Sequence, residues 1–198
     1  EESKNNLYVL NNDLEIVGKL EDLAPGERIY SARFMQGRAY MVTFRQVDPL
    51  FVIDLSAPES PEVLGFLKVT GFSNYLHPYD ESHIIGIGQE ASEQGRAQGV
   101  KIALFDVSDV ENPEEESKYV VEEGMWSQTD VSYDHKAFLF NKNKELMVLP
   151  ISYTKEIKAG EVSGRMYPSY QYWQGAFVFS INLDDGITLR EKINHEEN

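Results

Sequence analysis

Short apolar runs recur four times along the chain, and each run is closed by a polar residue that favours a turn. The runs with their closing residues are 7–11, 50–54, 102–106 and 176–180. The first two spacings fall near the roughly 40–50 residues of a four-stranded propeller blade, and the third spacing is longer by one insertion. Runs that are apolar at consecutive positions are typical of strands buried on both faces between stacked sheets. The pattern therefore predicts a repeated, all-β architecture.

Two long turns share the same chemistry. Asp54 and Asp106 each open an Asp-x-Ser sequence, and a proline follows each aspartate at the same offset, at Pro61 and Pro113. An aspartate side chain accepts the backbone N–H two residues later, and proline cannot continue a strand ladder. We therefore expect Asp54 and Asp106 to cap equivalent turns of the repeat.

The repeat predicts one domain over residues 1–198, a partial β-propeller of about three and a half four-stranded antiparallel blades. The predicted blades are a partial first at 7–20, a second at 28–67, a third at 72–121 and a fourth at 131–193 with an insertion at 152–174. In the fourth blade the first two strands are expected at 131–140 and 145–151. Closed propellers usually have four to eight blades, so either a longer chain or a second copy would complete the ring. A homodimer would total seven blades.

Composition excludes several classes of protein. The chain has 198 residues with a net charge of -15, and no cysteine. The acidic balance argues against a nucleic-acid partner, because nucleic acid is met by clustered Lys and Arg. Disulfide scaffolds and cysteine-ligated zinc are excluded, and no segment is long and apolar enough to span a membrane. We therefore expect no cofactor, no metal and no membrane span in this segment.

Three segments resemble a known family. Residues 28–56, 75–88 and 134–140 are similar to bacterial and archaeal secreted proteins whose C-terminal β-propeller domain is distantly related to WD40 repeats. The resemblance implies a propeller fold and an extracytoplasmic location, and it carries no established chemistry. Family members are considerably longer than this chain. The Gly-His and Trp-Asp dipeptides of WD40 repeats are missing here, so no WD40 partner is transferred.

Two motifs with catalytic or cofactor associations have simpler explanations. Gly86 and Gly88 formally begin a dinucleotide fingerprint, but the polar, glycine-punctuated segment that follows does not predict the helix that such a site needs. His77, Asp80 and His83 could hold a metal ion, yet Pro78 and the intervening turn favour hydrogen bonds across a hairpin instead.

Carboxylates are abundant enough to leave two further hypotheses open. The acidic cluster at 111–123 could attract calcium, but its spacing does not match a twelve-residue calcium loop, and a solvated edge is the simpler interpretation. Four aspartates at strand ends could converge in a channel, namely Asp48, Asp54, Asp106 and Asp130. A glycosidase needs two carboxylates at a set separation, which spacing along the chain does not determine.

The predicted insertion at 152–174 is rich in aromatic residues. Its candidate binding residues are Tyr167, Tyr170, Tyr172 and Trp173. Large rigid rings in a loop on a sheet scaffold make good contact surfaces. The alternative is that these rings fold back and cover the open side of the last blade.

The function predicted from the sequence is a non-enzymatic interaction or scaffold module that binds a protein or a surface polymer. A propeller enzyme of the lyase or glycosidase type, with a carboxylate or His site at the channel mouth, is the alternative. A third hypothesis is a purely structural segment that completes a larger ring.

Overall fold

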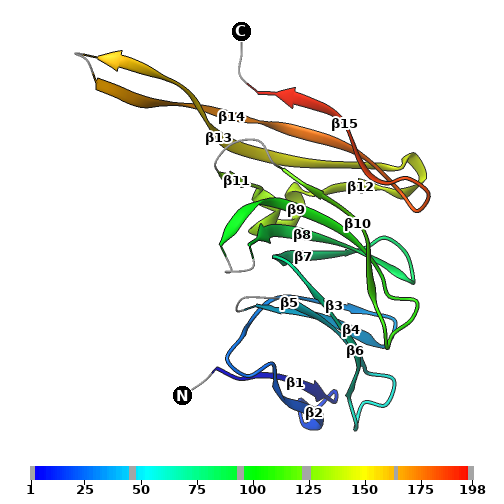
Figure 1. Cartoon of the computed structure of the whole chain (residues 1–198). Coiled ribbons are helices and arrows are strands. Elements are labelled where there is room, and N and C mark those ends of the chain that lie inside the picture. Colours follow the sequence, from blue (N-terminus) through cyan, green and yellow to red (C-terminus); the bar gives the residue numbers. More distant parts are fainter. Residues whose placement is uncertain (1–2, 45–47, 93–95, 122–125, 163–164, 196–198) are drawn as a thin grey trace.

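The computed structural model describes residues 3–44, 48–92, 96–121, 126–162 and 165–195, without the side chains of 48, 158–162 and 165–167. The described residues form four antiparallel sheets with three 3-10 helices, and no α-helix occurs among them. The sheets are stacked in chain order from the N-terminal to the C-terminal end (Figure 1). Within the described ranges, no helix has the length and apolarity needed to cross a membrane.

The first sheet has only two strands, and the next two sheets have four each. The first sheet contains β1 (Asn5–Leu10) and β2 (Ile16–Leu23). The second contains β3 (Arg28–Met35), β4 (Arg38–Phe44), β5 (Asp48–Asp54) and β6 (Glu62–Val69), paired in that order. The third contains β7 (Phe72–Pro78), β8 (His83–Ala91), β9 (Ala97–Asp106) and β10 (Glu114–Val120), again paired in chain order. Each four-stranded sheet is thus a simple meander.

The fourth sheet differs from the other sheets in its first strand. It contains β11 (Trp126–Gln128), β12 (Leu139–Asn141), β13 (Leu146–Val162), β14 (Arg165–Asn182) and β15 (Gly186–Asn194). Both β11 and β12 pair with β13, at Gln128↔Ser152 and Leu139↔Val148. The edge strand is therefore split into two short pieces that share one partner.

The predicted strand over 131–140 is wrong. The chain between β11 and β12 forms the 3-10 helices η1 (Asp130–Ser132) and η2 (His135–Ala137), and η3 (Lys142–Lys144) follows β12. The side chains of Thr129 and Asp134 accept the backbone N–H groups at the starts of η1 and η2. Such local hydrogen bonds offer the backbone an alternative to a strand ladder.

The predicted loop over 152–174 is also wrong, because this segment is the outer part of a long hairpin. Strands β13 and β14 have 17 and 18 residues, and they pair from Leu146↔Ser180 to Val162↔Arg165. The pairing has one register shift, between Ile157 and Gly160. Successive side chains of this segment therefore point to opposite faces of the sheet, as in any strand.

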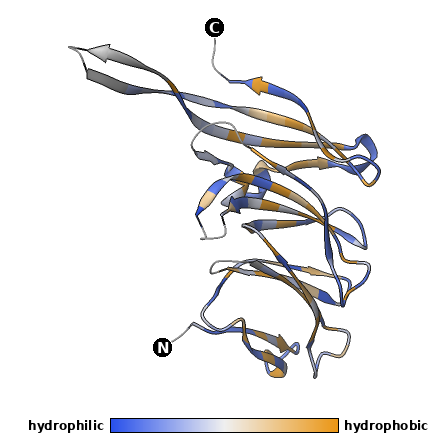
Figure 2. Ribbon diagram, viewed as in Figure 1, coloured by the Kyte–Doolittle hydropathy of each residue, from blue (hydrophilic) through white to orange (hydrophobic). Residues whose placement is uncertain are grey.

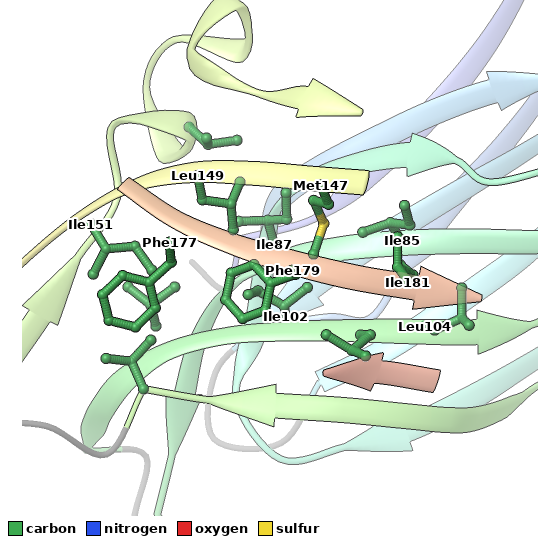
Figure 3. Packing of buried hydrophobic residues seen from close by; sticks show 14 of the residues in the cluster. Ile85, Ile87, Ile102, Leu104, Met147, Leu149, Ile151, Phe177, Phe179 and Ile181 are labelled. Carbon is green, nitrogen blue, oxygen red and sulfur yellow. The ribbon is translucent and has the colours of Figure 1, made fainter. Parts of the chain in front are cut away.

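The core consists of three apolar clusters, and each lies between two consecutive sheets. The largest cluster, between the third and fourth sheets, joins β8 and β9 to β13 and β14 through residues such as Ile87, Ile102, Leu149 and Phe179 (Figure 3). Figure 2 shows the same arrangement as hydrophobic stretches along the strands and hydrophilic residues in most turns. The stack is held together by burial between sheets.

The central strands contribute to two clusters at once. In β4, Tyr40 and Val42 face the third sheet, whereas Ala39 and Met41 face the first. Because side chains alternate across a strand, a strand in the middle of the stack must be apolar at every position. This explains the uninterrupted apolar runs of the sequence.

Replacing Gly88 with alanine should destabilise the stack. A Cβ at Gly88 would overlap the carbonyl oxygen of Phe72 on the neighbouring strand. We expect Gly88→Ala to lower the free energy of unfolding by about 1–3 kcal/mol, the usual cost of overpacking, as measured by urea denaturation. Gly37→Asn is the control, because Gly37 has a φ of 76° with no atom within 4 Å of its ideal Cβ, and asparagine tolerates that conformation. Equal stability of Gly88→Ala and the native chain would contradict this packing.

Candidate functional site

The hairpin of β13 and β14 extends beyond its neighbouring strands. Pairing of β13 with β11 ends at Thr154, and pairing of β14 with β15 begins at Gly175. Among the described residues, 155–162 and 165–174 have no strand partner outside β13 and β14, and these two segments form the ribbon that we call the arm. Figure 1 shows the arm reaching past the rest of the stack.

The candidate aromatic residues of the arm point to opposite faces. Trp173 stacks on Tyr153 with ring centroids 5.1 Å apart, and its edge meets Phe177 at 5.3 Å. Since Phe177 belongs to the core, Trp173 continues the core face of the sheet outward. Tyr170 and Tyr172 lie on the other face, opposite Glu156 and Thr154 in register, with 53% and 50% of their surface exposed.

Tyr167 lies on β14 opposite Gly160, but its side chain is outside the described residues. Of the four candidates, Trp173 packs toward the core, and Tyr170 and Tyr172 are accessible. Trp173 therefore fits the alternative in which the rings cover the last blade, whereas Tyr170 and Tyr172 fit an accessible contact surface. The two outcomes occur on one strand because successive side chains point to opposite faces.

A second feature is a cavity of about 290 Å³ where the first strands of three sheets begin. It lies among Tyr30 of β3, Phe72 and Asn74 of β7, and Trp126 and Gln128 of β11, so we call it the first-strand pocket. Residues of η1 line it as well. The sequence analysis missed this site, because its residues are far apart in the chain and the fourth blade was predicted to start after Trp126.

Asp54 and Asp106 end equivalent strands, β5 and β9. The Oδ1 atom of Asp54 accepts the backbone N–H of Ser56 at 3.1 Å, and that of Asp106 accepts the backbone N–H of Ser108 at 2.8 Å. The hydroxyl and N–H of Ser56 lower the pKa of Asp54, and the N–H of Ser108 lowers that of Asp106. Both carboxylates therefore cap the turns in which they lie.

The predicted His77, Asp80 and His83 group is divided between two environments. Asp80 Oδ1 lies 2.8 Å from His83 Nδ1, and it accepts a hydrogen bond from the backbone N–H of Ser82 with an N···O distance of 2.9 Å. The other carboxylate oxygen, Oδ2, accepts a hydrogen bond from Lys142 Nζ at 2.9 Å. His77 instead contacts the hydroxyl of Tyr75 through Nδ1 at 3.0 Å. No group of three metal-ligating side chains occurs in the part of the chain that the structure describes.

The remaining charged and glycine motifs have structural roles. Gly86 and Gly88 lie in β8, and the next described element is strand β9, so no helix N-terminus follows them. Glu115 of the acidic cluster pairs with the buried Lys101 at 2.5 Å, whereas residues 122 and 123 are outside the described ranges. Asp130 begins η1 and is exposed, and the side chain of Asp48 is outside the description.

The Asp80 network should make stability depend on pH. Burial alone would raise the pKa of Asp80, but hydrogen bonds from Lys142, His83 and Ser82 outweigh it and lower the pKa to about 2. A lowered pKa stabilises the fold above the unfolded value, near 4, and this contribution is lost as the pH falls to about 2. We expect Asp80→Asn to cost about 1–2 kcal/mol at pH 6, after allowance for solvent screening, and almost nothing at pH 2 in urea denaturation.

Lys142→Met is the matched background for this measurement, since it removes one hydrogen bond that lowers the pKa of Asp80. In that background the cost of Asp80→Asn should be smaller and should fade at a higher pH. A cost that stays constant between pH 2 and pH 6 would contradict the network.

Asp106→Ala should destabilise the chain by about 1 kcal/mol, the usual scale for a lost local hydrogen bond, in thermal or urea unfolding. Asp106→Asn should recover most of this loss, because its amide oxygen still accepts the N–H of Ser108. If both variants lose the same stability, charge rather than turn capping is responsible.

Comparisons with known proteins identify the family of this fold. A family model for a β-propeller domain matches residues 1–198. An uncharacterized protein of Archaeoglobus fulgidus is 44% identical over 147 residues, which are 74% of this chain and 22% of that protein. An uncharacterized protein of Methanocaldococcus jannaschii is 45% identical over 146 residues, with the same shares. The chain thus spans about a fifth of the length of these relatives. The family that the sequence resembles is confirmed, and the chain belongs to the β-propeller domain family.

Proposed function

We propose that this chain is a section of a larger β-propeller, three four-stranded blades and the outer half of another. In this proposal the ring is completed by the rest of a longer extracytoplasmic protein, and the domain works as a non-enzymatic interaction module. The three sheets that begin at β3, β7 and β11 correspond to the complete blades. The pair of β1 and β2 corresponds to the half blade, since it lacks the two strands that begin each of the other sheets.

The two ends of the stack support an incomplete ring. On the first sheet, Tyr8, Leu10 and Ile16 have between 46% and 60% of their surface exposed, on the face opposite the buried Leu7. On the last sheet Ile193 is 51% exposed. Apolar patches of this kind seldom stay bare, and adjacent blades would cover them. The greater length of the archaeal relatives leaves room for such blades.

The arm is the observation that carries the interaction role. An adjacent blade of ordinary strand length would cover the part of β14 that pairs with β15, and the arm would remain accessible beyond it. Tyr170 and Tyr172 are side by side on one face of the arm, two residues apart on the same strand. Exposed tyrosines supply a large contact area at a small entropic cost, which is typical of binding surfaces. The proposed partner is a protein or a surface polymer.

The double variant Tyr170→Ser/Tyr172→Ser tests the role of the arm. The labelled chain is incubated with a cell-envelope fraction, and its saturable co-sedimentation is measured. Losing two aromatic anchors should weaken binding about tenfold or more, because tenfold corresponds to about 1.4 kcal/mol and a single anchor often contributes that much. Thermal stability should be unchanged, since both side chains are exposed.

Tyr8→Ser is the matched control, because it removes a similarly exposed tyrosine at the opposite end of the stack. It should bind like the native chain. Equal binding by the double variant and the native chain, or a loss of stability that parallels the loss of binding, would contradict the proposal.

A further inference from the structure

The first-strand pocket combines aromatic rings from three sheets. Tyr30 and Phe72 form its apolar wall with ring centroids 4.5 Å apart, and both rings also meet Phe44. Trp126 and Tyr133 also line the pocket, although 50% and 89% of their surface is exposed. Large rings that line a cavity and remain exposed can accept a ligand on their faces.

The polar groups of the pocket are mainly amides with hydrogen-bonding capacity to spare. Gln89 donates from Nε2 to the carbonyl of Ser127 at 3.3 Å, whereas its Oε1 has no hydrogen-bond partner among the described residues. Within the same ranges, the side chains of Asn74 and Gln128 make no hydrogen bond. Each amide offers both donors and an acceptor. Buried polar groups of proteins are normally paired, so the buried, unpaired Oε1 of Gln89 points to a ligand, and the partly exposed amides of Asn74 and Gln128 line the same pocket.

The described lining of the pocket is uncharged although the chain is strongly acidic. Among the described residues that line it, none carries an ionisable acid or base apart from the two tyrosines. The net charge of -15 disfavours polyanions, and no carboxylate is among the described lining residues to bind a cation. The ligand class that fits aromatic faces together with neutral donors and acceptors is a neutral polyhydroxylated molecule.

We propose that the first-strand pocket binds a neutral saccharide. The apolar C–H face of a pyranose ring stacks on Trp126, since its hydrogens meet the negative face of the indole. The hydroxyl groups of the sugar hydrogen-bond to the amides of Asn74, Gln89 and Gln128. A volume of about 290 Å³ lies at the lower end of the range for small-molecule sites, and it suits one or two sugar rings rather than a folded partner. This site is distinct from the arm and does not depend on binding there.

The two tryptophans of the chain provide a direct experiment. Trp173→Phe leaves Trp126 as the only tryptophan, which is excited selectively over the tyrosines at long wavelength, and phenylalanine retains a ring at residue 173 to stack on Tyr153. This single-tryptophan chain is titrated with neutral trisaccharides of glucose, mannose and N-acetylglucosamine. We expect at least one of them to produce a saturable change in Trp126 fluorescence that does not weaken between 0.05 and about 0.5 M salt, because no charge is involved.

Variants assign the binding to the pocket. By calorimetry of the otherwise native chain, Trp126→Ala and Gln128→Ala should each weaken the trisaccharide at least tenfold, while Tyr170→Ala on the arm should leave its affinity unchanged. Circular dichroism and thermal unfolding of each variant check that it is folded. Asn74→Gln is the conservative variant, and it should weaken binding less than Asn74→Ala because it retains the amide.

Several results would overturn the proposal. One is that no trisaccharide binds at millimolar concentration. Another is that only a sulfated polysaccharide binds, and that salt abolishes this binding. A third is that trisaccharide binding persists in Trp126→Ala. Binding of a casein peptide digest that is lost in Trp126→Ala, without any saccharide binding, would assign the pocket to peptides instead. None of these results would affect the role proposed for the arm, which its own variants test.

Discussion

The central strands of this chain are apolar on both faces, so each sheet is stable only when another sheet covers each side. Strand β4 illustrates the constraint, because Tyr40 is buried against the third sheet and Met41 against the first. In a single sheet in water, these side chains would be exposed on both faces, at a cost of roughly 1.5–3 kcal/mol for each large one. Stacking therefore continues until something other than water covers the end faces, and the two end sheets of this chain are left with apolar residues outside.

The same constraint determines where binding can occur. Sheet faces are occupied by packing, so the accessible chemistry lies at strand ends and on segments that extend beyond the stack. The arm and the first-strand pocket are two such places, and they meet on the fourth sheet. Trp126 of the pocket is paired with Thr154, and Thr154 is in turn opposite Tyr172 at the base of the arm. A saccharide in the pocket and a partner on the arm would therefore be near neighbours.

Turn chemistry links the sheets at the other ends of the strands. Asp80 lies in the turn between β7 and β8, and it accepts a hydrogen bond from Lys142 of η3, which joins β12 to β13 of the fourth sheet, 62 residues later. The Lys142 ammonium also lies 4.4 Å from the centroid of the Tyr79 ring. The carboxylates of Asp54 and Asp106, by contrast, accept N–H groups of their own turns. Aspartates that look alike in the sequence thus serve either one turn or the contact between two sheets.

Local sequence alone determined the strands of the second and third sheets and the acceptor roles of Asp54 and Asp106, because alternation and turn chemistry act between near neighbours. The segments between β11 and β12 and beyond Thr154 required the tertiary structure. Between β11 and β12, the caps of Thr129 and Asp134 offer the backbone an alternative to the ladder, and beyond Thr154 the ladder extends through the register of β14 against β13. The first-strand pocket could not be predicted for another reason. Its residues come from three sheets, and only the stacking of those sheets brings them together.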